Sequence, residues 1–282
     1  MKNVVLAAMT AAVGLCAAAN AELIIGATQQ GTLVQFDSAD PGNILSGVPI
    51  TGLAQNEFIR GLDIRPATGQ TFGLGSFGNL YTLNTANGTA TLVGMITPSI
   101  NGAAFGFDFN PVVDRLRVVS DTQQNLRINP ASAAAIVDTP LAYAAGDPRF
   151  GIDPNVVHAA YTNSFAGATS TTLYVIDTGE DILAIQNPAN NGTLTSVGPL
   201  GADVNVIGGF DISGVTGTAY LGVQAQAPNR TTFFTINLAT GAATPLGEVG
   251  GGLTLTGMAV IPSPGAGALL AIAGVLAFRR ER

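Results

Sequence analysis

A unit of about 45 residues recurs along this chain, and it constrains the fold more than any other feature. Each copy opens on a glycine, an apolar residue and, in four of five cases, an aspartate. The copies begin at Gly61, Gly106, Gly151, Gly209 and, in degenerate form, Gly257, at intervals of 45, 45, 58 and 48 residues. A fixed period of this length is the signature of repeated supersecondary units such as solenoids and propellers.

The sequence within each unit indicates short antiparallel strands. Apolar and polar residues alternate over segments such as 79–84 and 89–94, and Asn-Gly pairs at 87–88 and 191–192 separate such segments. Asn-Gly between alternating segments is typical of tight β-hairpins. Four short strands in about 45 residues is the size of one β-propeller blade.

The two ends of the repeated region complement each other. Residues 22–48 supply three strands and residues 253–261 supply one. The sequence therefore predicts an all-β, five-bladed β-propeller, closed by pairing of the N- and C-terminal strands, with no unprotected sheet edge. A two-sheet sandwich or an open β solenoid stays open as an alternative, because a repeat shows the unit and not its arrangement.

Residues 106–130 resemble a known family. Gly106-Phe107-Asp108-Phe109-Asn110-Pro111, the segment 114–121 and the segment 125–130 look like the hallmark of the domain-of-unknown-function family numbered 4394. The resemblance covers nearly all of residues 22–262. It implies an exported bacterial protein with propeller-like repeats, and it carries over neither an activity nor site residues.

The N-terminal 21 residues have the pattern of a secretory signal peptide. Lys2 is followed by an apolar run over residues 4–18, and then by Ala19-Asn20-Ala21. Small residues at these spacings predict cleavage between Ala21 and Glu22. A buried helix is the alternative. Cleavage would also remove Cys16, the single cysteine.

The C-terminal residues 262–282 have the pattern of a sorting tail. Pro262-Ser263-Pro264 precedes an apolar segment over 265–278 and a basic end. Fourteen helical residues would reach about 21 Å, short of the roughly 30 Å hydrocarbon core. The tail resembles the PEP-CTERM sorting signal, which implies an exosortase-like processing enzyme as partner, although Ser263 stands where that signal has Glu. A permanent tail anchor is the alternative.

These ends predict the organisation and the location of the chain. We expect a signal peptide over 1–21, a propeller domain over 22–261 and the sorting tail over 262–282. The propeller would be exported to the cell envelope or beyond, tethered transiently or permanently to the inner membrane by the tail alone. We expect it to be a monomer.

Composition excludes several functional classes. Residues 22–262 contain seven arginines, no lysine, no cysteine and 17 acidic residues, a net charge of −10. A nucleic-acid partner needs a basic face and is not expected. Thiol nucleophiles, disulfides and Schiff-base lysines are excluded, and the lone His158 cannot build a zinc site. No Gly-x-Ser-x-Gly motif is present for serine catalysis.

The repeated aspartates are the first candidate site. They are Asp63, Asp108, Asp153 and Asp211. If the innermost strand of each blade carries one, the carboxylates would converge on the axis, where oxygen ligands suit a hard cation such as Ca²⁺. Calcium is the one cofactor that this pattern suggests. In the alternative interpretation each Asp accepts backbone N–H groups of a neighbouring turn.

An arginine cluster is the second candidate site. Arg115, Arg117 and Arg127 lie within thirteen residues, together with Asp114 and Asp121. Guanidinium groups bind carboxylates and sulfates through paired hydrogen bonds, so Arg115, Arg117, Arg127 and Asp121 are candidate ligand-binding residues. Alternatively, the arginines pair with Asp114 and Asp121 across the blade surface.

Two functions are open from the sequence. The first is an exported, non-catalytic binding or structural propeller of the envelope or extracellular matrix, with a surface glycan or matrix protein as partner. The second is a glycan hydrolase or lyase that uses the repeated aspartates, because glycoside hydrolysis needs two carboxyl groups about 5 to 9 Å apart.

Overall fold

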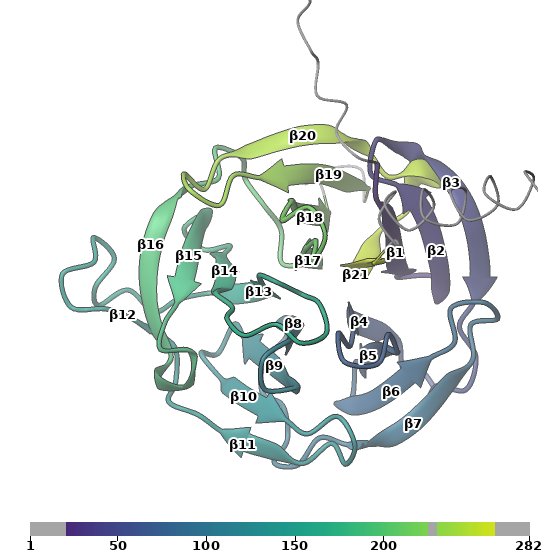
Figure 1. Cartoon of the computed structure of the whole chain (residues 1–282), viewed down its shortest axis with the longest axis horizontal. Helices are drawn as coiled ribbons and strands as arrows, with labels where there is room; N and C mark the ends of the chain where they lie inside the picture. The colour runs from purple at the N-terminus through teal and green to yellow at the C-terminus, as the bar shows by residue number, and fades with distance from the viewer. Residues whose placement is uncertain (1–20, 225–229, 263–282) are drawn as a thin grey trace, which may run out of the picture.

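The computed structural model describes residues 21–224 and 230–262, and its strands form five sheets around a central axis (Figure 1). The predicted five-bladed β-propeller is confirmed. Blade 1 consists of β21 (Leu255–Val260), β1 (Leu23–Thr28), β2 (Thr32–Asp37) and β3 (Asp40–Pro49). Blade 2 consists of β4 (Ile59–Ile64), β5 (Thr71–Gly75), β6 (Asn79–Leu83) and β7 (Ala90–Met95). Blade 3 consists of β8 (Phe105–Asn110), β9 (Arg115–Ser120), β10 (Asn125–Ile128) and β11 (Ala135–Val137).

The remaining two blades complete the ring. Blade 4 consists of β13 (Val156–Tyr161), β14 (Leu173–Asp177), β15 (Ile182–Gln186), β16 (Thr193–Pro199) and the short β12 (Ala142–Tyr143), which pairs in parallel with β16. Blade 5 consists of β17 (Gly208–Ile212), β18 (Ala219–Gln224), β19 (Thr231–Ile236) and β20 (Ala243–Glu248). Two short 3₁₀ turns cover Ala189–Asn191 and Gly250–Gly252.

The ring closes where the two ends of the described chain meet. Strand β1 pairs antiparallel with β21, and Ile25 lies opposite Ala259. The Ile261 N–H adds a bond of 2.8 Å to the Leu23 carbonyl. The three-plus-one closure predicted from the sequence is therefore the closure that forms.

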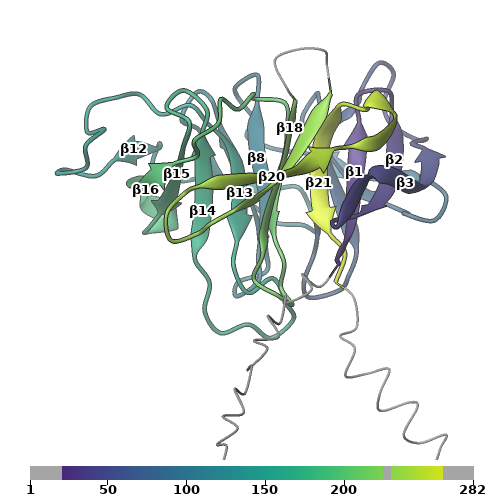
Figure 2. The same cartoon turned by 90° about the horizontal axis from the view of Figure 1, so that it is seen from above.

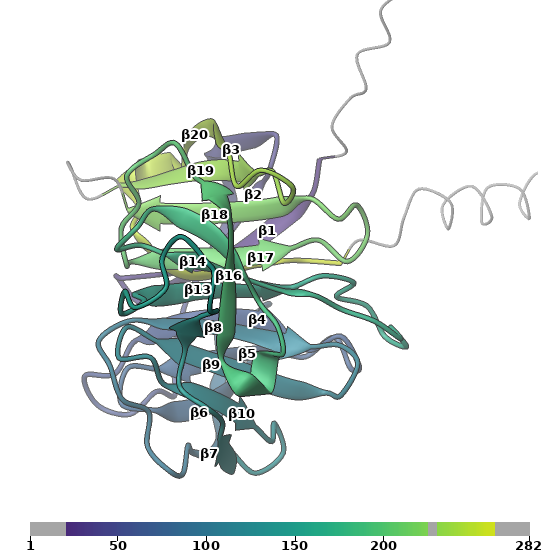
Figure 3. The same cartoon turned by 90° about the vertical axis from the view of Figure 1, so that its left-hand side faces the viewer.

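Apolar side chains fill the seams between blades rather than the axis. Successive side chains on a strand point to opposite faces, so each blade packs against both neighbours. Phe72 of blade 2 meets Phe109 of blade 3 edge to face, with ring centroids 5.2 Å apart. The inner strands run along the axis, whereas outer strands such as β20 and β16 are inclined to it (Figures 2 and 3). This inclination is the ordinary twist of a sheet.

The repeated glycines let the inner strands approach one another closely. A Cβ atom on Gly106 of β8 would lie 2.9 Å from the Ala159 nitrogen of β13. One on Gly257 of β21 would lie 2.9 Å from the Leu62 nitrogen of β4. No side chain fits at these distances, which explains why the unit opens on glycine.

In blade 4 the glycine and aspartate of the predicted repeat, Gly151 and Asp153, do not lie in the inner strand. Residues 151–153 lie in the loop before β13, and Asp153 is exposed. Within β13, His158 takes the glycine position and Ala160 takes the aspartate position, because Tyr161 donates its N–H to Asp108 as Phe109 does to Asp63. The second strand of this blade is β14, which follows β13 after a loop.

The predicted signal peptide and the predicted sorting tail lie outside the described residues, apart from Ala21 and Pro262. Within 21–224 and 230–262, no helix has the length and apolar character needed to cross a membrane.

Candidate functional site

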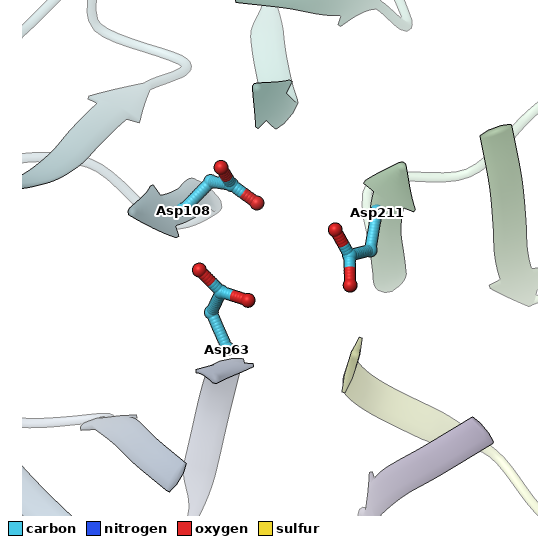
Figure 4. Close-up of side chains that lie close together, drawn as sticks. All are labelled: Asp63, Asp108 and Asp211. Atoms are coloured by element: carbon cyan, nitrogen blue, oxygen red, sulfur yellow. The ribbon is translucent and has the colours of Figure 1, made fainter. Parts of the chain in front are cut away.

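Three of the four predicted aspartates meet on the axis. Asp63 of β4, Asp108 of β8 and Asp211 of β17 are 3%, 2% and 4% exposed. One carboxylate oxygen from each lies within 4.8 Å of the others, and the three groups point toward one another (Figure 4). Asp153 is not among them.

Each of these aspartates joins its blade to the next one. Asp63 accepts the N–H of Phe109 in blade 3 at 2.6 Å, and Asp211 accepts the N–H of Val260 in blade 1 at 2.6 Å. Asp108 accepts the N–H of Tyr161 in blade 4 at 2.9 Å. The alternative interpretation was thus right that these groups accept backbone N–H bonds, but the donors belong to the neighbouring inner strand and not to a turn.

The two alanines at the aspartate position explain the remaining bonds. Blades 4 and 1 carry Ala160 and Ala259 there, so they offer no acceptor to the blade that follows. Asp211 and Asp63 then accept their own next N–H, from Ile212 and Ile64, at 2.6 Å through their other oxygen.

Asp108 differs from the other two aspartates. The N–H that follows it, on Phe109, already donates to Asp63. One oxygen of Asp108 accepts from Tyr161, and the other accepts no hydrogen bond from the residues that the structure describes. Among the three axial aspartates, which form one layer across the axis, Asp108 therefore has a carboxylate oxygen that can accept a further hydrogen bond.

Burial and mutual repulsion favour the protonated carboxyl groups. Burial raises the pKa of Asp63 well above its ordinary value, and the charge of Asp211 raises it further. Burial also raises the pKa of Asp108, with added repulsion from Asp63 and Asp211. For Asp211, burial raises the pKa to about 6, against the two backbone hydrogen bonds that lower it.

There is little space beside the aspartates. The neighbouring axial cavity, lined by Gly61, Gly106, His158, Gly209 and Gly257 among others, has a volume of about 10 Å³. That is room for roughly one water molecule. A sugar ring cannot reach these carboxyl groups along this part of the axis.

The arginine cluster borders a much larger groove, on the seam between blades 3 and 4. The groove has a volume of about 550 Å³ and contains Arg115, Arg117 and Arg127 in its wall, with Asn110, Tyr161 and the segment 187–191. A smaller hollow of about 190 Å³ shares Asn110 and Tyr161 with it and extends along the same seam.

The three arginines are not equivalent. Arg117 is 2% exposed, and it donates to Asp138 at 2.7 Å, to Asn125 at 2.6 Å and to Asn190 at 2.7 Å. Arg127 binds both oxygens of Asp138, at 2.8 and 2.9 Å. Arg115 is exposed, and within the described part of the chain it forms no ion pair. The hydrogen bond that its side chain forms there is a donation from the guanidinium group to the Asp114 carbonyl at 2.9 Å.

Asp114 and Asp121, which lie near the three arginines in sequence, do not form ion pairs with them. Asp114 pairs with Arg65 of blade 2, and this pair lowers the pKa of Asp114. Asp121 accepts the Ala103 N–H at 2.9 Å, beyond the other end of β9, and does not line the groove. The predicted pairing of the cluster with Asp114 and Asp121 is therefore wrong. The actual partner, Asp138, follows β11, and only the register of β10 against β11 could have indicated it.

Comparisons with known proteins identify a family for the chain. The model of the family described as a domain of unknown function (DUF4394) matches residues 32–259. No curated protein matches the chain. Among solved structures, a glutaminyl cyclase from Myxococcus xanthus is 17% identical, with a TM-score of 0.44 over 70% of this chain and 79% of that one.

Two further solved structures resemble the chain at similar levels. A Bacteroides thetaiotaomicron protein of unknown function is 12% identical, with a TM-score of 0.49 over 88% of this chain and 68% of that one. A chain of a nidogen/laminin complex is 13% identical, with a TM-score of 0.46 over 84% of each. At these identities the likenesses concern the fold alone and indicate no activity.

Proposed function

The chain belongs to this family of unknown function, and we propose that it is an exported, non-catalytic binding propeller that holds an acidic glycan in the groove between blades 3 and 4. The observation that carries the proposal is Arg115. It is a guanidinium group at a groove of about 550 Å³ and has no carboxylate partner within the described residues.

Charge and hydrogen-bonding groups of the groove suit such a ligand. Arg117 and Arg127 share the single carboxylate of Asp138, so the groove wall carries an excess of positive charge in a chain that is otherwise acidic. Asn187 and Asn191 add amide groups that can bind sugar hydroxyls. Arg117 acts as a buried support, and Arg115 is the group that would touch the ligand.

Burial of the aspartates speaks against the hydrolase or lyase alternative. Asp63 and Asp211 accept backbone N–H groups with both carboxylate oxygens and Asp108 with one, and all three adjoin a space of about one water molecule. The exposed Asp153 stands apart from them. No observation places two of these carboxyl groups around a glycan.

The binding proposal is tested with polygalacturonate, a polymer of uronic acid, against neutral dextran. We expect the purified chain to bind polygalacturonate, to bind it less at high salt, and not to bind dextran. Arg115→Gln should weaken binding at least five-fold. Arg230→Gln is the matched control, because Arg230 is an exposed arginine of blade 5, paired with Glu248. Release of new reducing ends from polygalacturonate would instead support the hydrolase alternative.

Export and sorting are part of the proposal and rest on the sequence of the two ends. The Glu22 nitrogen donates to Ser38 Oγ at 2.9 Å, a bond that a free amino group at Glu22 can also make. Cleavage after Ala21 is thus compatible with the described start of the propeller. Mass spectrometry of the chain from its native host would test it, with Glu22 expected as the first residue and a C-terminus near residue 262 expected after exosortase-like processing.

A further inference from the structure

A second pocket lies at the mouth of the axis, at the end where the inner strands begin. It has a volume of about 170 Å³, and its wall includes Phe58, Arg60, Phe105, Val206 and Ile207. An apolar cavity of about 150 Å³ is large enough to admit benzene. This pocket lies away from the arginine groove, because the groove is lined by the ends of β8 and β13 and the pocket by the starts of β4, β8 and β17.

Arg60 gives the pocket its chemical character. The guanidinium carbon lies 5.3 Å from the centre of the Phe58 ring and 5.4 Å from that of Phe105, so two aromatic rings flank it. One terminal nitrogen donates to the Ala103 carbonyl at 2.8 Å. Within residues 21–224 and 230–262, the buried Nε atom has no hydrogen-bond partner, and the second terminal nitrogen donates to no atom.

The nearby acids do not neutralise this guanidinium group directly. Asp121 and Glu57 are near enough to favour the charged form of Arg60, and neither forms an ion pair with it. The carboxylate of Asp121 accepts the Ala103 N–H. Glu57 is occupied by the Phe77 N–H, the Asn79 amide and the Tyr81 hydroxyl. A buried donor without an acceptor costs free energy, and a ligand that supplies an acceptor recovers it.

We propose that this axial mouth binds a small monocarboxylate with a flat apolar body. The ligand's carboxylate would meet the unpartnered edge of Arg60, formed by Nε and the second terminal nitrogen, in the two-bond arrangement that guanidinium and carboxylate groups favour. Its body would lie against Phe105 and Ile207. The pocket admits about one aromatic ring, so the class is that of benzoate-sized acids and not of polymers.

The test measures binding of benzoate to the purified full-length chain by calorimetry, up to about 20 mM, which covers the millimolar range expected of a fragment-sized ligand. Benzamide has the same shape without the charge, and acetate has the charge without the ring. We expect benzoate to bind at least ten-fold more tightly than either. Arg60→Gln should abolish this preference, whereas Arg230→Gln, an exposed arginine of blade 5 that lines neither pocket, should leave it unchanged.

A second variant keeps the test decisive if Arg60→Gln fails to fold. Val206 is 39% exposed at the rim, so Val206→Trp can fill the mouth without entering the core, and it should weaken benzoate binding at least ten-fold. Absence of benzoate binding would overturn the proposal. So would equal binding of benzamide, or binding that survives in Val206→Trp and in a folded Arg60→Gln variant. Binding of polygalacturonate in the other groove is independent of all these outcomes.

Discussion

The carboxylate of Asp63 in β4 accepts the backbone N–H of Phe109 in β8 at 2.6 Å, across the boundary between two blades. The inner strands β4 and β8 belong to different sheets, so no backbone ladder joins them. A side chain on the axis supplies the missing acceptor. Asp108 and Asp211 repeat the arrangement at two further boundaries.

This arrangement predicts that Asp63→Asn and Asp108→Asn differ in their effect on the free energy of unfolding. Asp63 accepts two N–H groups, from Phe109 and Ile64, so Asp63→Asn turns an amide NH₂ toward one of them. We expect the free energy of unfolding to fall by about 1–3 kcal/mol. Asp108 accepts one, so Asp108→Asn can keep that bond and donate its NH₂ to the neighbouring carboxylates. It should be neutral or stabilising, because it also removes a buried acidic group whose ionised form is disfavoured by burial and by repulsion from Asp63 and Asp211.

Urea unfolding of both variants at pH 7 measures the difference, and Asp108→Asn serves as the matched control for Asp63→Asn. Equal losses in the two variants would contradict the assignment of bonds in this layer.

Calcium should have little effect on stability. Five of the six carboxylate oxygens in the layer accept backbone N–H groups, which leaves mainly the second oxygen of Asp108 for a cation that takes six to eight ligands. We expect equal melting temperatures in millimolar calcium and in chelator. A calcium-dependent rise of about 5–10 °C, lost in Asp108→Asn, would assign a metal site to the layer instead.

The sequence predicted the blades because each carries its own turn and strand signals. Closure was predictable too, because Leu23 begins a three-strand unit and Leu255 begins the missing fourth strand. Blade 4 was misaligned because Gly151 and Asp153 imitate the motif in a loop, while the true inner strand has His158 and Ala160 in its place. At this position His158 is buried, and its ring is bonded to the Asn205 carbonyl at 3.1 Å.

The candidate sites were less predictable because they form between blades. Arg117 and Asp138 come together only through the pairing of β9, β10 and β11. Arginine precedes the repeated glycine in blade 2 alone, so a comparison of the repeats does not single out Arg60. A charged residue inside an inner strand was the available signal for it.

The close approach of inner strands predicts the effect of a single methyl group. Gly106→Ala would place a Cβ atom 2.8 Å from the Ala159 Cβ and 2.9 Å from its nitrogen, so β8 and β13 must separate. We expect a loss of about 1–3 kcal/mol in the free energy of unfolding. Gly42→Ala in the outer strand β3 is the control, since its Cβ would meet nothing nearer than 3.9 Å. If Gly106→Ala left the free energy of unfolding unchanged, β8 and β13 would separate without cost and the prediction would be wrong.

Arg117 should matter for folding and Arg115 should not. Arg117→Met removes the donor of four side-chain hydrogen bonds and leaves Asp138 and Asn125 buried with fewer partners. Breaking a buried pair in this way costs about 3–5 kcal/mol. Arg115→Gln lies at the surface and should change stability by less than about 0.5 kcal/mol. Thermal and urea melts of both variants check this contrast, and similar losses would refute the division of roles in the groove.

The buried carboxyl groups on the axis contribute stability that rises as the pH falls from 7.5 to 5. Asp211 has a pKa of about 6 in the folded protein and about 3.9 when unfolded, so in this range the folded state binds a proton that the unfolded state does not. Asp211 alone contributes about 1 kcal/mol at pH 5, and Asp63 and Asp108 act in the same direction. This stabilisation is complete below the unfolded value and is lost as the pH rises through the folded one.

His158 acts against this rise. Burial lowers its pKa to about 4, so below pH 6.5 the unfolded state binds the extra proton, which costs the folded state about 2 kcal/mol at pH 5. Relative to the unmodified chain, His158→Asn should therefore gain stability between pH 7.5 and pH 5, whereas Asp108→Asn should lose it. Urea midpoints of the three proteins at both pH values measure these changes. A change in Asp108→Asn equal to that of the unmodified chain would contradict a raised pKa of Asp108 in the folded state.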